Sequence, residues 1–177
     1  MEFELLKGDL LFSNNGCSVY ATNDVDLAIM EWKDEKACHL AEKLHGVVKR
    51  HALHSNFVRH FGKCELLVQR MEPLPLTVRA HSTVNQASVR FVTDDGESHA
   101  RDELTGVKRA RLDVMEDTAL HLARSLRPYL GQAGIKEWEL SLSFGICPSG
   151  ECVLEVPNPL TCDLGSTDYG TLITYLS

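Results

Sequence analysis

The most restrictive feature of the sequence is a stretch near its carboxyl end in which apolar and polar residues alternate strictly. The apolar positions are Trp138, Leu140, Leu142 and Phe144, and the polar ones are Glu139, Ser141 and Ser143. Residues two apart share one face of a strand, so this pattern predicts a half-buried strand. A turn at 146–150 and an apolar run at 152–156 predict its hairpin partner. The polar face of this hairpin is where a functional site could lie.

A helical period precedes this hairpin. Apolar residues follow one another at steps of three and four, at Leu112, Met115, Ala119, Leu122, Leu126 and Tyr129. That spacing places them on one stripe of a helix, which we expect to run from about 104 to 130. Gly131 and Gly134 are suited to ending it.

The first half of the chain combines a second helix with short strands. The apolar spacing after Asp34, a residue suited to an N-cap, predicts a helix over about 34–60. Strands are predicted at 18–21, 27–32, 65–71, 77–80 and 88–93, with a turn at 94–96. Pro73 and Pro75 cannot continue a helix, and we interpret them as a hinge or a crossing between two lobes.

Composition excludes several classes of function. A chain of 177 residues with 44% hydrophobic content can form one core or two small lobes. A net charge of -7 argues against non-specific binding to nucleic acid or to an anionic membrane. Residues 1–11 do not resemble a secretory signal, and no apolar stretch approaches the roughly 20 residues that span a bilayer. We therefore expect a cytoplasmic protein.

The cysteines and histidines do not predict a metal centre. In a cytoplasmic chain the six cysteines are expected to be free thiols, although Cys147 and Cys152 could approach each other across the hairpin. Several histidines fall between His39 and His60, but histidines on a helix surface usually bind nothing. Cys17 would act as a nucleophile only if its pKa were lowered.

Several short motifs occur in an order that resembles one enzyme family. Residues 19–24 read V-Y-A-T-N-D, 31–34 read E-W-K-D, 67–72 read L-V-Q-R-M-E, and 142–145 read L-S-F-G. They resemble the V-Y-x-T-x-D, F-K-D, hinge-strand and L-E-F-G segments of phosphoribosylaminoimidazole-succinocarboxamide (SAICAR) synthetases. Pro75-Leu76 is similar to that family's P-L-E, and weaker matches at 134–135, 153–154 and 161–162 extend the likeness towards the carboxyl end.

The resemblance implies a fold and a chemistry. The family is α+β and is related in plan to protein kinases. We therefore expect a small β-rich nucleotide-binding lobe at 1–72 and a shortened α+β lobe at 73–177. SAICAR synthetases use ATP and magnesium to join aspartate to the carboxylate of a phosphoribosyl-aminoimidazole substrate in purine synthesis.

This sequence departs from the family pattern where the pattern carries charge. The family loop Y-E-G-K-A-K has two lysines, whereas residues 12–17 read F-S-N-N-G-C. At the positions of the aspartate, lysine and glutamate in the family's D-F-K-L-E-F-G strand, this sequence has Glu139, Ser141 and Ser143. Of the acidic pair after the last strand only Glu155 remains. Roughly twenty residues separate Ser82 from the late helix, where the family has a long insert.

Candidate ligand-binding residues follow from the resemblance. The implied ligand is ATP or ADP, with the adenine held by the backbone of Gln69, Arg70 and Met71 and enclosed by Val19 and Met71. Lys33 matches the lysine of F-K-D and could meet a phosphate. In the alternative interpretation, Val19 and Met71 are core residues and Lys33 is a solvated lysine.

The substrate and metal positions have weaker counterparts. Arg79 and His81 lie near the family arginine of P-L-E-V-V-V-R-N and are the candidate substrate-binding residues. His81 could instead be an ordinary surface histidine. Glu155 is the one candidate metal ligand, or else a solvated residue at a strand end. Because magnesium prefers carboxylate oxygens, the resemblance gives little support for a bound magnesium ion.

Three functional hypotheses follow. The first is a SAICAR synthetase-like protein that has lost the family reaction and retains binding of an adenine nucleotide or of a protein partner. The alternative is an active ATP-dependent ligase with a rearranged site. The third is a structural protein with a closed pocket. The catalytic residues and the oligomeric state are not predicted.

Overall fold

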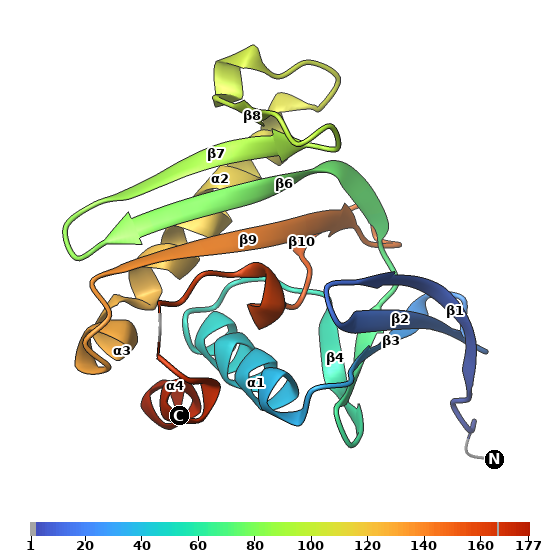
Figure 1. The fold of residues 1–177 in the computed structure, drawn as a ribbon. Coiled ribbons are helices and arrows are strands. Elements are labelled where there is room, and N and C mark those ends of the chain that lie inside the picture. The colour runs from blue at the N-terminus through green and yellow to red at the C-terminus, as the bar shows by residue number, and fades with distance from the viewer. Residues whose placement is uncertain (1–2, 166) are drawn as a thin grey trace.

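The computed structural model describes residues 3–165 and 167–177, which form two antiparallel sheets with helices packed around them (Figure 1). The first sheet has the strand order β1-β2-β3-β5-β4. Its strands are β1 (Lys7–Asn14), β2 (Cys17–Thr22), β3 (Leu27–Trp32), β4 (Phe57–Gly62) and β5 (Glu65–Gln69). The predicted strands in this half are confirmed, and β1 is an addition whose residues are all exposed.

The second sheet has the strand order β10-β9-β6-β7-β8. Its strands are β6 (Glu72–Thr83), β7 (Ala87–Thr93), β8 (Ser98–His99), β9 (Glu137–Ile146) and β10 (Cys152–Leu154). The alternation that predicted β9 is confirmed, because its four apolar residues are each 1% exposed. They face the helical side of the sheet, which leaves Glu139, Ser141 and Ser143 on the opposite face.

The helices are α1 (Glu35–Arg50), α2 (Arg109–Ser125), α3 (Arg127–Gln132) and α4 (Tyr169–Leu176). Helix α2 lies behind β6, β7 and β9, and α4 lies beside α1 at the end of the chain (Figure 1). No helix in the described part of the chain is long and apolar enough to cross a membrane.

Helix α1 packs against both sheets. The carboxylate of Asp34 accepts hydrogen bonds from the amides of Lys36 and Ala37, which confirms the predicted N-cap. One part of its buried face packs into the core of the first sheet, with Ala37, Cys38 and Ala41. The other part packs into the core behind the second sheet, with Leu40, Leu44, Val47 and Val48.

The prediction that this helix continues to residue 60 is wrong. The chain leaves the helix at Ala52, whose φ is +55°, and the Leu53 amide donates back to the Val48 carbonyl. That pair of features is the usual left-handed ending of a helix. The residues that follow pair with β5 as strand β4, a partner that local periodicity cannot reveal.

The late helix is shorter than predicted and is divided. Gly106, with a φ of +83°, lies in the non-helical segment before α2, so the helix begins at Arg109 and not at 104. Pro128 has no amide hydrogen to continue the helical ladder, and α3 starts anew at Arg127. The predicted apolar stripe is nevertheless buried across both helices, with Tyr129 partly buried.

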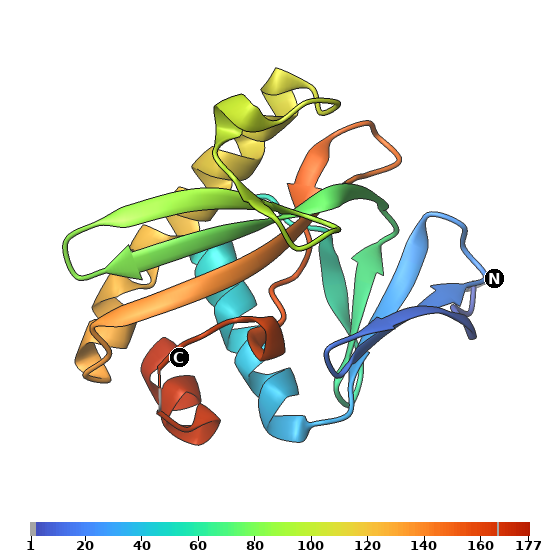
Figure 2. The same cartoon turned by 45° about the horizontal axis from the view of Figure 1, so that its top comes forward.

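The crossing between the two sheets takes only two residues. Strand β5 ends at Gln69 and β6 starts at Glu72, so Arg70 and Met71 connect the sheets (Figure 2). The two prolines that suggested a crossing lie within the first residues of β6, where the register with β9 shifts. We call residues 69–71 the hinge.

Candidate functional site

The candidate site is a cleft between the two sheets. It consists of two adjoining cavities with volumes of about 300 and about 260 Å³. The two cavities share the lining residues Phe12, Val19, Met30, Pro73 and Glu155. We call the larger one, next to residues 69–71, the hinge end, and the other the polar end.

The hinge end has apolar walls and a backbone edge. Val19, Ala28, Met30 and Val68 line it together with the hinge residues Gln69, Arg70 and Met71. Val19 is also part of the core of the first sheet, so the ligand-binding and core interpretations of this residue both apply. A flat apolar ring would fit between such walls.

Most of the hinge amides already have partners. The Gln69 amide donates to the Asn56 carbonyl at 2.6 Å, and the Arg70 amide donates to the Asp26 carbonyl at 2.8 Å. The Met71 amide donates to no group among the described residues. Of the three hinge amides named from the sequence, the one at Met71 is therefore without a partner among the described residues.

Gly145 shapes the hinge from the side of β9. A Cβ atom added there would lie 2.7 Å from the Met71 Cβ and 2.9 Å from the Glu72 carbonyl oxygen. Contacts this short require the backbone to shift. The glycine of the L-S-F-G motif thus allows Met71 to pack directly against β9.

Asn56 connects the hinge to the segment that carries Glu155. Its side-chain amide donates to the Gln69 carbonyl at 3.2 Å, and its Oδ1 accepts from the Val156 amide at 3.0 Å. It also lines the hinge end of the cleft. Sequence reasoning missed this residue, because a single asparagine between a helix and a strand gives no signal of its partners.

The polar end is lined mainly by neutral polar side chains and two carboxylates. The neutral ones are Asn14, Thr77, Ser141, Ser143, Asn158 and Thr161, and the carboxylates are Asp94 and Glu155. Burial raises the pKa of Glu155 to about 7, and no cationic side chain pairs with it among residues 3–165 and 167–177. The polar face of β9 thus contributes to the cleft, as the alternation had predicted.

The turn between β1 and β2 packs against the carboxyl-terminal segment. Asn15 and Gly16 both have positive φ, and a Cβ at Gly16 would lie 2.7 Å from the Leu160 Cδ1. The Asn158 side chain donates to the Asn15 carbonyl at 3.4 Å and accepts from the Trp32 indole at 3.2 Å. The turn that matches the family's lysine-bearing loop is therefore held against the segment that carries Asn158 and Leu160.

Cys17 is not an activated nucleophile. Burial, together with the nearby Glu155 carboxylate, raises the pKa of its thiol to about 12. The thiol is therefore protonated near neutral pH. All six cysteines are free, so Cys147 and Cys152 do not form the bridge that their positions allowed. Cys147 instead donates to the Gln69 side chain at 3.1 Å.

The remaining candidate residues lie outside the cleft. Lys33 is exposed after β3 and lines neither cavity. The Nε atom of Arg79 lies 3.9 Å from Oε1 of Glu139, and Nε2 of His81 lies 2.5 Å from Oε1 of Glu137. Both contacts are on the open face of the second sheet. The structure thus brings Val19, the hinge and Glu155 together and leaves Lys33, Arg79 and His81 apart.

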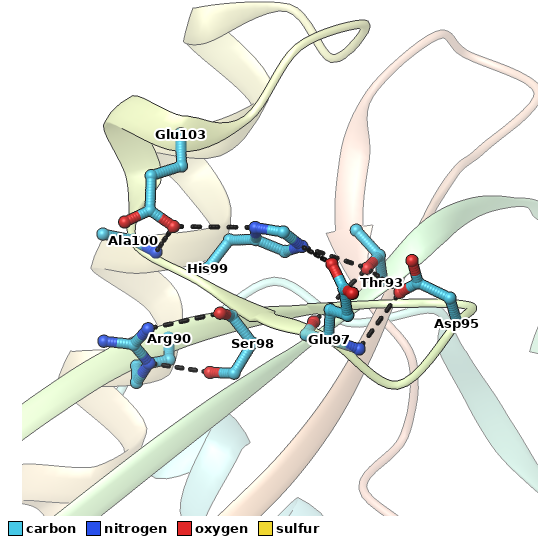
Figure 3. Close-up of polar contacts among 8 residues, drawn as sticks. All are labelled: Arg90, Thr93, Asp95, Glu97, Ser98, His99, Ala100 and Glu103. Carbon is cyan, nitrogen blue, oxygen red and sulfur yellow. Dashed lines mark hydrogen bonds and ion pairs between the residues drawn. The ribbon is translucent and has the colours of Figure 1, made fainter.

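A second polar cluster surrounds the turn between β7 and β8 (Figure 3). Ligand atoms of Asp95, Glu97 and His99 lie within 4.8 Å of one another. Much of their bonding capacity is already used, because Asp95 accepts from Thr93 and the Glu97 amide, and His99 pairs with Glu103 at 3.6 Å. These bonds explain the cluster as one that stabilises the turn.

The fold and the cleft together define an α+β protein of two antiparallel sheets with a cleft between them, next to the hinge. No family model matches the chain. Two curated phosphoribosylaminoimidazole-succinocarboxamide synthases do match. One, from Synechococcus sp., is 24% identical over 93% of this chain and 83% of its own length. The other, from Exiguobacterium sibiricum, is 23% identical over 90% of this chain and 86% of its own.

Solved structures of the same enzyme as these relatives also resemble this protein. A SAICAR synthetase in complex with ADP has a TM-score of 0.77 at 19% identity and covers 90% of this chain and 86% of its own. The enzyme from Ehrlichia chaffeensis has a TM-score of 0.76 at 13% identity, with 95% of each chain covered. The protein therefore has the SAICAR synthetase fold, as the sequence motifs had predicted, in a short chain of 177 residues.

Proposed function

We propose that this protein binds an adenine-containing ligand at the hinge and does not catalyse the ligation performed by SAICAR synthetases. The observation that carries the proposal is the contrast between the two ends of one cleft. The hinge end has apolar walls and is lined by Met71, whose amide has no hydrogen-bond partner among the described residues. The polar end has no lysine or arginine among its described lining residues. A related SAICAR synthetase structure contains ADP, which supports an adenine ligand.

The proposed loss of catalysis follows from the charges. Phosphoryl transfer is accelerated mainly by cations and hydrogen-bond donors that stabilise negative charge on the transferring group. The polar end instead presents the carboxylates of Asp94 and Glu155. Lys33 lies outside the cleft and could not supply the missing positive charge without a rearrangement.

Calorimetric titration with a panel of adenine compounds tests binding at the hinge. The variant Gly145→Ala should weaken binding of every member of the panel at least about tenfold, since its methyl group displaces Met71. Gly131→Ala is the matched control, because a Cβ at that helical position meets nothing within 4 Å. If no compound binds the unmodified protein, the proposed ligand class is wrong.

A ligation assay tests the second half of the proposal. The protein is mixed with ATP, magnesium, aspartate and the phosphoribosyl-aminoimidazole carboxylate, and ADP release is measured. We expect no release above that of a blank. Release that depends on aspartate and on the carboxylate substrate would instead support the alternative, an active ligase with a rearranged site.

Protein binding is a second candidate function, and β1 is the observation that favours it. This edge strand exposes Leu10 and Phe12, which are 55% and 48% accessible. Edge strands with exposed apolar side chains are suited to pairing with another chain. Sedimentation of the unmodified protein and of Leu10→Lys over a range of concentrations would detect self-association through β1.

The six free thiols suit the cytoplasm, where we propose that the protein acts.

A further inference from the structure

The polar end of the cleft is equipped for hydroxyl groups. The side chains of Asn14, Thr77, Ser141 and Ser143 line it and take no hydrogen-bond partner among the described residues. Each can both donate and accept a hydrogen bond. A ligand with several hydroxyl groups, such as a ribose, could pair with them without bringing a charge into the cleft.

The same end is poorly equipped for phosphate. Two acidic residues line it, Asp94 and Glu155. Among the described residues that line either cavity, the basic one is Arg70, which is exposed and lines the hinge end. Lys7, on β1, is already paired with Glu31 and Glu65. A phosphate group here would meet negative charge and neutral groups, without an ammonium or guanidinium partner.

Glu155 has the position that matters most for favouring a sugar over a phosphate in this cleft. It lines both cavities, so any ligand that extends from the hinge to the polar end passes beside it. Its carboxylate can accept hydrogen bonds from ribose hydroxyls, and it repels phosphate oxygens whenever it is ionised. One residue thus favours the sugar and disfavours the phosphate.

We propose that the cleft selects an adenine nucleoside and discriminates against its phosphate esters. This inference rests on the proposed function, because it assumes that the adenine ring occupies the hinge end. It specifies the ligand class further: a neutral purine nucleoside whose sugar lies among Ser141, Ser143 and Glu155.

The test is a calorimetric comparison of adenosine, AMP and ADP at one ionic strength with a metal chelator present. We expect adenosine to bind about tenfold or more tightly than ADP, with AMP between them. Equal or tighter binding of ADP would overturn the nucleoside selection and leave the adenine site standing. Failure of all three to bind would overturn both proposals, so the two failures are distinguishable.

A change of charge at the polar end separates electrostatic selection from a simple lack of space. Ser143 is exposed, and Ser143→Lys adds an ammonium group beside the cleft without disturbing the core. We expect the ratio of ADP affinity to adenosine affinity to be at least about tenfold higher in this variant than in the unmodified protein, because the ammonium group attracts phosphate and the ribose loses a hydroxyl partner. Ser149→Lys, in the exposed turn after β9, is the control for net charge. If both lysine variants change ADP binding equally, the selection does not lie in the cleft and the proposal fails.

Discussion

The Oδ1 atom of Asn56 accepts a hydrogen bond from the Val156 amide at 3.0 Å, across 100 positions of sequence. Its side-chain nitrogen donates to the Gln69 carbonyl at 3.2 Å. This buried side chain therefore holds the hinge and the segment that carries Glu155 at a set separation. Asn56 thus connects two segments of the cleft that it also lines.

Asn56→Ala should lower the free energy of unfolding by about 2 to 4 kcal/mol, because it leaves buried backbone groups without partners. Urea denaturation measures the change, with the exposed Asn85→Ala as control. Ligand affinity should fall as well, since Gln69 and Val156 are no longer held together. A loss below about 0.5 kcal/mol would show that Asn56 does not connect the lobes energetically.

Glu155 should make the protein less stable as pH rises from about 4.5 to 7. Burial raises the pKa of its carboxyl to about 7 in the folded protein, above the ordinary value of 4.5. The unfolded chain therefore releases this proton first, which favours unfolding. Glu155→Gln should thus stabilise the protein by about 1 to 3 kcal/mol at pH 8 and have little effect at pH 4. Equal effects at both pH values would contradict the raised pKa.

His45 should make the protein less stable as pH falls, whereas Glu155 does so as pH rises. Burial, with smaller effects of Lys49 and His60, lowers its pKa to about 4 from the ordinary 6.5. The unfolded chain binds the proton first as pH falls, so the stability present above pH 6.5 is lost towards pH 4. His45→Gln should flatten the pH dependence of unfolding in that window by up to about 3 kcal/mol. His39→Gln, at an exposed position of the same helix, is the control variant.

Binding of ADP, where it is measurable, should be nearly independent of magnesium. A magnesium ion that bridges phosphates normally takes one or two protein carboxylates as ligands. The family glutamate on β9 is replaced by Ser143, and burial raises the pKa of Glu155 to about 7, which disfavours the ionised form that a metal ion needs. The measurement is ADP affinity with excess magnesium and with a chelator. A change above about tenfold, or 1.4 kcal/mol, would reveal a working metal site.

Local patterns in the sequence determined the helices and strands whose conformation does not depend on contacts with residues distant in the chain. The alternation in β9 and the stripe along α2 and α3 follow from which residues avoid water, and both are buried as predicted. Asp34 caps α1 through amides only two and three residues away. The ordered motifs also predicted the fold, because their spacing reflects the same succession of strands and helices.

Only the tertiary structure decided which strands pair and which polar groups lose water. Strand β4 looked helical because its pairing with β5 depends on residues outside the local period. The sequence suggested a solvated Glu155 as one alternative, whereas Glu155 lies in the cleft between the two sheets, where burial raises its pKa. Desolvation and hydrogen bonding act between groups far apart in the chain, as between Asn56 and Val156, so they appear only when the two lobes are brought together.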